Sequence, residues 1–148
     1  MKIVLQRVKK AAVEVKQNVV GEIEQGVCLL VGIEKGDTQQ EAQYLANKIV
    51  ELRIFPDGEE KMNLSLLDIQ GEVLAVSQFT LAGSLKKGRR PSFESAEEPE
   101  KAESLFRYFI DMLKQRGVKV ETGVFGALME VCLVNDGPVT FMLEKKNL

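Results

Sequence analysis

Two short polar motifs contain the residue types that are best suited to chemistry. The first follows an apolar run and reads Ser77-Gln78-Phe79-Thr80-Leu81. Hydroxyl groups, a side-chain amide and free backbone N–H groups in one small volume can hold an ester carbonyl and stabilise the oxyanion that forms from it. A strand end that merely emerges into solvent has the same composition, so these residues alone leave both interpretations open.

The second motif reads Asn135-Asp136-Gly137-Pro138-Val139-Thr140. Glycine gives the backbone freedom and proline fixes φ, so the pattern predicts a turn between two strands. The trans preference before proline is only about 0.5–1 kcal/mol, which leaves a cis Gly137–Pro138 bond open. From the residues alone, an ordinary trans turn is the expectation.

The chain has no histidine, which excludes Ser-His-Asp and Cys-His triads and HExxH metal sites. Its two cysteines, Cys28 and Cys132, each lie in an apolar run. This placement predicts small buried side chains in place of a disulfide or a zinc site. An enzyme built from this chain would use carboxylates, lysines, hydroxyls, backbone amides or groups of its own substrate. We therefore expect neither a metal nor a cofactor.

Charge is balanced, with 20 basic and 22 acidic residues. Non-specific affinity for nucleic acid comes mainly from phosphate neutralisation, so the composition excludes a general nucleic-acid binder. One local cluster remains, Lys86-Lys87-Gly88-Arg89-Arg90, which is either a solvated loop or a local phosphate contact. The longest apolar run, residues 26–33, is far shorter than the roughly 18 residues of a membrane span. Residues 1–6 lack the pattern of a signal peptide, and a cytoplasmic protein is expected.

Hydrophobic periodicity predicts the elements that must position these motifs. Residues 2–33 are strand-rich, with a turn at Gln17-Asn18, and residues 26–33 form a central strand buried on both faces. A helix begins at Asp37 as N-cap, with Gln40 as its capping-box partner, and its segment ends at residues 56–58. Residues 57–70 form a loop with a short excursion.

A second inner strand covers residues 72–81, and a loop covers 83–97. A second helix runs from Pro99 to Gly117. Residues 118–143 give three short strands, broken at 123–126 and at 135–138. The expected class is α/β with mixed α+β character. It is one domain, 1–148, in which two helices pack on a mixed sheet, in the order two strands, two strand–helix units and three strands.

Over essentially its whole length the chain resembles the D-aminoacyl-tRNA deacylases of the bacterial and eukaryotic type. Paired SQFTL and NxGPxT motifs, at 77–81 and 135–140, are a specific signature in a chain of this length. The resemblance is also carried by Met1-Lys2-Ile3-Val4-Leu5-Gln6-Arg7-Val8, by Gly26-Val27-Cys28-Leu29-Leu30-Val31-Gly32-Ile33 and by Arg90-Pro91-Ser92-Phe93.

This resemblance implies a homodimer that hydrolyses the ester of D-aminoacyl-tRNA at composite sites on the subunit interface. Gly137–Pro138 would be cis and reach into the partner's site, where its carbonyls would fill the space of an L side chain. Glycine mischarged onto alanine tRNA would also be cleared. The resemblance assigns substrate positioning to Ser77 and Gln78, and oxyanion binding to the backbone amides around Phe79 and Thr80.

Thr80 has been regarded as a nucleophile in that family, but without a histidine base its hydroxyl is a weak one. We expect water activated with help from the terminal ribose hydroxyl of the RNA. The resemblance also implies that Arg7 braces the Gly-Pro loop, where a surface ion pair is the other interpretation. Acceptor-stem phosphates would be contacted by the basic loop, through Lys86, Lys87, Arg89 and Arg90.

The residues alone also suit two other functions. One is a non-enzymatic dimeric module that binds RNA or nucleotides, and the other is an esterase for free D-amino-acid esters.

Overall fold

The structure is a computed structural model that describes residues 1–146. A mixed sheet has the strand order β2-β1-β3-β6-β7, and β8 pairs with the remaining edge of β1, while β4 and β5 form a separate ribbon. The elements in chain order are β1 (Lys2–Val15), β2 (Asn18–Ile23), β3 (Gly26–Gly32), α1 (Gln39–Glu51), β4 (Phe55–Pro56), β5 (Met62–Leu64), α2 (Leu66–Ile69), β6 (Glu72–Ser77), the 3-10 helix η1 (Phe79–Ala82), α3 (Pro99–Gln115), β7 (Lys119–Thr122) and β8 (Glu130–Glu144).

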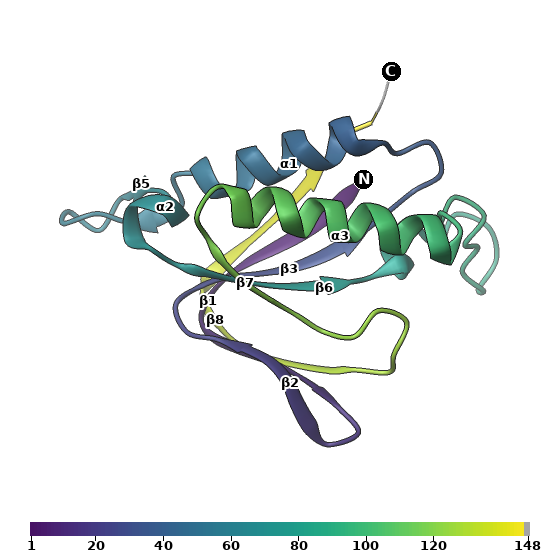
Figure 1. The fold of residues 1–148 in the computed structure, drawn as a ribbon, viewed down its shortest axis with the longest axis horizontal. Helices are drawn as coiled ribbons and strands as arrows, with labels where there is room; N and C mark the ends of the chain where they lie inside the picture. Colours follow the sequence, from purple (N-terminus) through teal and green to yellow (C-terminus); the bar gives the residue numbers. More distant parts are fainter. Residues whose placement is uncertain (147–148) are drawn as a thin grey trace.

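Both long helices cover one face of the sheet and lie side by side (Figure 1). Arg116, the C-cap residue of α3, donates to Asn47 Oδ1 at 3.0 Å and to Glu51 Oε1 at 2.6 Å on α1. Between helices and sheet lies the larger apolar core, which includes Leu5, Leu29 and other residues of every second position in β1, β3 and β6. The predicted α/β class and the two packed helices are confirmed.

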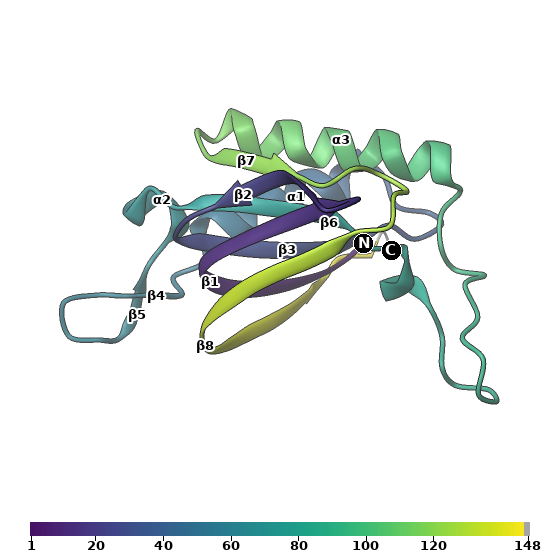
Figure 2. The ribbon, with the colours of Figure 1, turned by 90° about the horizontal axis from the view of Figure 1, so that it is seen from below.

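The opposite face of the sheet has a second, smaller core. It holds Val8, Ala11 and Val13 of β1 together with Cys28, Leu74 and Val76 of the central strands. The first half of β8 and the β1–β2 hairpin curl over this face (Figure 2), so only part of it is covered. Burial raises the pKa of the Cys28 thiol to about 11, as expected for a small buried side chain.

The predicted start of the first helix is wrong by one residue. Thr38 is the N-cap of α1, and Glu41 is its capping-box partner. Asp37 has another role, because its carboxylate accepts from the Met1 ammonium at 2.6 Å and from the Glu34 N–H at 2.7 Å. Two adjacent residues were both suitable caps, and the long-range ion pair with Met1 decides between them.

The second inner strand also ends earlier than predicted. β6 stops at Ser77, and residues 79–82 turn into η1 instead of extending to Leu81. The Gln78 N–H still donates to the Val31 carbonyl at 2.8 Å, after which the chain leaves the sheet. Gly32 permits this turn, because a Cβ there would lie 2.7 Å from Leu81 Cβ.

The tail contains two strands, not three. β8 is continuous over 15 residues, and residues 135–138 lie inside it instead of in a turn between strands. β8 pairs with β1 both before and after residues 136–139, so the two halves belong to one strand. Cys132 lies on the exposed side of β8, so the prediction that it is buried is wrong for this chain.

The polar segment 57–70 contains the predicted short excursion, as β5 and the single-turn helix α2. Within residues 1–146, no helix is long and apolar enough to cross a membrane.

Candidate active site at two ends of the sheet

Ser77, Gln78, Phe79 and Thr80 lie where β6 leaves the sheet. Phe79 and Thr80 are the first residues of η1, and first-turn N–H groups have no intrahelical acceptor. Within residues 1–146 neither of these two N–H groups has a hydrogen-bond acceptor. Both are therefore available to a ligand. This arrangement suits an oxyanion, since preorganised backbone donors cost no reorganisation during the reaction.

Among residues 1–146, no base is bonded to the Thr80 hydroxyl. Its recorded partner within the described residues is the Gln78 side-chain amide, whose Nε2 donates to Thr80 Oγ1 at 2.5 Å. An amide N–H cannot accept the hydroxyl proton, so this contact orients Thr80 without activating it. The geometry favours a positioning role for both side chains.

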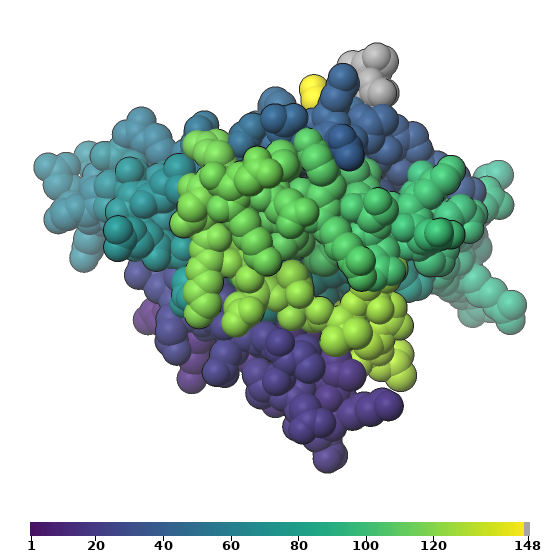
Figure 3. Space-filling view, viewed as in Figure 1, coloured from purple at the N-terminus to yellow at the C-terminus, as the bar shows by residue number. Residues whose placement is uncertain are grey.

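A pocket of about 470 Å³ adjoins Ser77, Gln78 and Phe79. Its remaining wall is mostly apolar and comes from three other segments: Ile33 and Val76 of the central strands, Ala96, Glu97, Pro99 and Ala102 before and within α3, and Phe125, Gly126, Ala127, Leu128, Met129 and Val131 before and within β8. The segment around 125–129 emerges below α3 in Figure 3. A volume of this size suits an amino-acid side chain with part of a nucleoside.

The 125–129 wall was not predicted from the sequence, because residues 123–126 were expected only as a break between two short strands. Leu128, in this wall, is apolar and 94 % exposed. The rim also includes Phe79, which is 58 % exposed and packs edge-on against Phe93 with ring centroids 5.2 Å apart. Exposed apolar side chains around a pocket mark a surface that binds something.

Gly137 and Pro138 lie in a bulge of β8. Gln6 pairs with Thr140 and Val8 with Asn135, so two steps along β1 (8 − 6) match five along β8 (140 − 135). The three extra residues leave the ladder, as in other bulges that re-aim a short segment. The Gly137–Pro138 bond is cis, whereas the residues alone had favoured trans.

The side chain of Asn135 closes this bulge. Its Nδ2 donates to the carbonyls of Arg7, at 3.1 Å, and Val139, at 2.9 Å, and its Oδ1 accepts from the Val139 N–H at 3.4 Å. A Cβ on Gly137 would lie only 2.0 Å from that Oδ1. The conformation of the bulge therefore requires both Asn135 and a glycine at position 137.

Arg7 supports the same bulge from β1. Its Nε donates to the Asp136 carbonyl at 2.9 Å and lies 3.3 Å from the Asp136 carboxylate, while Nη1 donates to the Ile54 carbonyl at 2.6 Å. Only 11 % of the Arg7 side chain is exposed. Because the guanidinium joins β8 to the segment after α1, it fixes the bulge against the body of the protein.

Within one chain, the bulge and the Ser77–Thr80 segment lie at opposite ends of the sheet. Val8, beside the bulge, pairs with Gly26, which pairs with Glu72, whereas Ser77 pairs with Val31. Glu72 and Ser77 are five residues apart on β6 (77 − 72), or about 17 Å at the usual rise per residue. The two predicted motifs therefore do not meet within one chain.

The basic cluster lies in a loop that projects from the end of the molecule carrying Ser77 (Figure 2). Reciprocal backbone bonds between Ser84 and Ser92, of 2.7 and 2.9 Å, close the base of this loop. Its cations, Lys86, Lys87, Arg89 and Arg90, are all exposed. Among residues 1–146, no group of three or more His, Cys, Asp or Glu residues could hold a metal ion.

Comparison with known proteins gives this geometry a context. Residues 4–144 match the family described as D-Tyr-tRNA(Tyr) deacylase. The D-aminoacyl-tRNA deacylase of Geotalea uraniireducens is 59 % identical, over 97 % of this chain and 93 % of the relative.

Two solved structures share the fold. The c-Myc DNA Unwinding Element Binding Protein has a TM-score of 0.93 at 41 % identity and covers 99 % of this chain and 100 % of its own. A probable eukaryotic D-amino acid tRNA deacylase has a TM-score of 0.83 at 19 % identity, which shows the shared fold alone, over 96 % and 97 % of the two chains. Given the family match and the full-length relatives, the chain belongs to the D-Tyr-tRNA(Tyr) deacylase family.

Proposed function

We propose that this chain hydrolyses the ester bond of D-aminoacyl-tRNA as a homodimer, and so proofreads chirality in translation. The observation that carries the proposal is the separation of the two motifs within one chain. A two-fold axis across the sheet face exchanges its ends, so the bulge of one subunit would meet the Ser77–Thr80 end of its partner.

The open face of the sheet supports such a dimer. Met142, Val4 and Leu30 are direct cross-strand neighbours on β8, β1 and β3, and they form an apolar row that continues to the buried Val76. Met142 is 80 % exposed. The outer edge of β8 also has no partner strand within the described residues. A long exposed strand beside an apolar row is a surface that a second copy would cover.

The proposed chemistry uses backbone groups and the substrate. The free N–H groups of Phe79 and Thr80 would hold the carbonyl oxygen as it becomes an oxyanion, and Ser77 and Gln78 would position the ester. Water would attack, assisted by the free ribose hydroxyl, because among residues 1–146 no base is bonded to the Thr80 hydroxyl. An aminoacyl ester is activated, so positioning and oxyanion binding can supply much of the acceleration.

The site would distinguish D from L substrates by steric exclusion of the L side chain. The Gly137 and Pro138 carbonyls of the partner would occupy the space that an L side chain needs, and Arg7 and Asn135 hold that bulge in place. D-amino acids of different sizes would pass, and so would glycine, including glycine mischarged onto alanine tRNA. The basic loop would contact acceptor-stem phosphates. Because the substrate would be tRNA, the protein would act in the cytoplasm.

The proposal is tested by hydrolysis of matched D-tyrosyl-tRNA and L-tyrosyl-tRNA by the purified, chelator-treated protein. Selective release of D-tyrosine is expected. If a folded dimer releases neither amino acid, the binding module becomes the better account, a role consistent with the name of the DNA-element-binding relative. If D-tyrosine ethyl ester is hydrolysed as fast as the tRNA ester, the activity belongs to an esterase for free D-amino-acid esters.

A further inference from the structure

We propose that Lys48 and Lys145, held on the ring of Tyr44, form a second phosphate-binding site for the tRNA substrate, separate from the basic loop. This inference rests on the proposed function. Tyr44 and Lys48 lie one turn apart on α1, and Lys145 follows β8. The Nζ atoms of Lys48 and Lys145 lie 5.7 and 4.8 Å from the centroid of the Tyr44 ring.

Both ammonium groups lie by the Tyr44 ring, and within residues 1–146 neither has a carboxylate partner. No carboxylate within the described residues lies within 4.0 Å of either Nζ, and the nearby Glu144 pairs with Lys146 at 3.3 Å. Two like charges at one site repel each other, and the electron-rich face of a tyrosine offsets only part of that repulsion. A bound anion would complete the charge balance.

The surroundings favour an extended polyanion with apolar parts over a small free ion. Tyr44, which is 46 % exposed, borders a groove of about 520 Å³ between α1 and β8. Phe141, which is exposed, forms part of its apolar wall. A nucleotide strand offers a phosphate for the lysines together with sugar and base surface for the apolar wall.

Lys145 lies at the end of the molecule that carries the Ser77 segment. The Lys145 N–H donates to the Met1 carbonyl at 3.0 Å, and the neighbouring Lys2 pairs with Gly32, against which Leu81 packs. Three strand spacings separate β8 from β6, or about 14 Å. The lysine pair and the basic loop would therefore contact the RNA on two different sides of the pocket.

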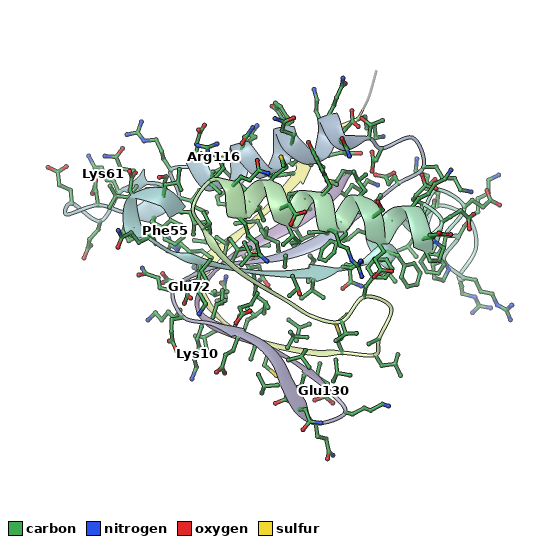
Figure 4. All side chains as sticks on the ribbon, viewed as in Figure 1. Lys10, Phe55, Lys61, Glu72, Arg116 and Glu130 are labelled. Atoms are coloured by element: carbon green, nitrogen blue, oxygen red, sulfur yellow. The ribbon has the colours of Figure 1, made fainter. Side chains whose placement is uncertain are left out.

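The test removes the pair as Lys48→Ala/Lys145→Ala and measures binding of deacylated tRNA by fluorescence anisotropy over a range of salt concentrations. Loss of one phosphate contact predicts binding weaker by about tenfold, and a slope of log affinity against log salt that is smaller by about one. Lys61→Ala/Lys114→Ala is the matched control, because it removes two exposed lysines that do not line the groove. Lys61 lies between β4 and β5 (Figure 4), and Lys114 lies in the last turn of α3.

A second pair of variants tests the ring. Tyr44→Leu should weaken tRNA binding and Tyr44→Phe should retain it, because only leucine removes the aromatic face. For activity, the double lysine variant should lose about tenfold in kcat/KM on D-tyrosyl-tRNA and keep its rate on the D-tyrosyl ester of adenosine, which has no phosphate.

Equal tRNA affinity and salt slope in the lysine variant and its control would overturn the inference. So would an equal loss on both ester substrates, which would indicate a merely structural role. Failure of the proposed function looks different, because wild-type protein would then hydrolyse neither ester. The binding measurement would still decide whether the lysine pair contacts RNA.

Discussion

The two ends of the sheet are held in place by different kinds of hydrogen bond. At the Ser77 end, backbone hydrogen bonds fix the chain: Gln78 N–H to Val31, Leu81 N–H to Gln78 and Gly83 N–H to Thr80. At the bulge, the side chains of Asn135 and Arg7 hold carbonyls that the ladder no longer satisfies. The first end should therefore keep its backbone geometry when a side chain is changed, and the second should not.

The largest effect is expected from Phe79→Pro. Proline suits the first position of a helix but removes the N–H, and loss of one oxyanion donor costs about 10²–10³ in kcat. Phe79→Ala, which loses the ring and keeps the N–H, is the matched control, and Thr80→Ala should also keep most activity. The measurement is the turnover of D-tyrosyl-tRNA by each of these variants. If Thr80→Ala loses nearly all turnover while folded, the hydroxyl is the nucleophile after all.

The second largest effect is expected from Gly137→Ala, with a loss of about 10² in turnover of D-tyrosyl-tRNA and weaker rejection of L-tyrosyl-tRNA. The new Cβ would meet Asn135 Oδ1 at 2.0 Å and the Val139 nitrogen at 2.4 Å, so the bulge must move, and small misplacements at a site have effects of this size. Gly58→Ala, where a Cβ would meet nothing within 4 Å, should change neither rate. Unchanged D/L selectivity in a folded Gly137→Ala dimer would argue against a steric role for the bulge.

Asn135→Asp should destabilise the protein by about 1–3 kcal/mol, because two carbonyls lose their donor and face a carboxylate. Urea unfolding measures this change, and D/L selectivity should fall in parallel. Asn18→Asp, at an exposed turn with one amide contact, is the comparison. Equal stability of the two variants would show that Asn135 does not hold the bulge.

The smallest effect is expected from an ion pair that involves neither of the two motifs. Lys119, 2.9 Å from Glu72, and the Glu24 N–H lower the pKa of the Glu72 carboxyl (Figure 4). A carboxyl whose pKa is lowered on folding contributes stability above its unfolded pKa, about 4.3, and loses it as pH falls through the lower folded pKa. Urea unfolding of Glu72→Gln should therefore show a shallower fall in stability at acid pH, with D/L selectivity unchanged. An identical acid profile would exclude this pair as a contributor.

The sequence was most informative where periodicity and packing agree. The apolar run ending at Ile33 and the stripe that begins at Ala102 have the burial that was expected. Prediction failed where distant residues compete for a segment. The buried Met1 ammonium takes Asp37 away from the helix cap, and β1 keeps β8 continuous through a motif whose residues favour a turn. The pocket wall at Met129 was missed for the same reason, since loop composition does not reveal which strand end the loop faces.

The most direct test of the composite site mixes two inactive subunits. Phe79→Pro impairs the strand end and Gly137→Ala impairs the bulge, so either homodimer alone has no intact site. Random exchange makes about half of the dimers mixed, each with one intact site, so about one quarter of wild-type activity on D-tyrosyl-tRNA should return. If exchange is verified and no activity returns, the two motifs do not form one site across the interface.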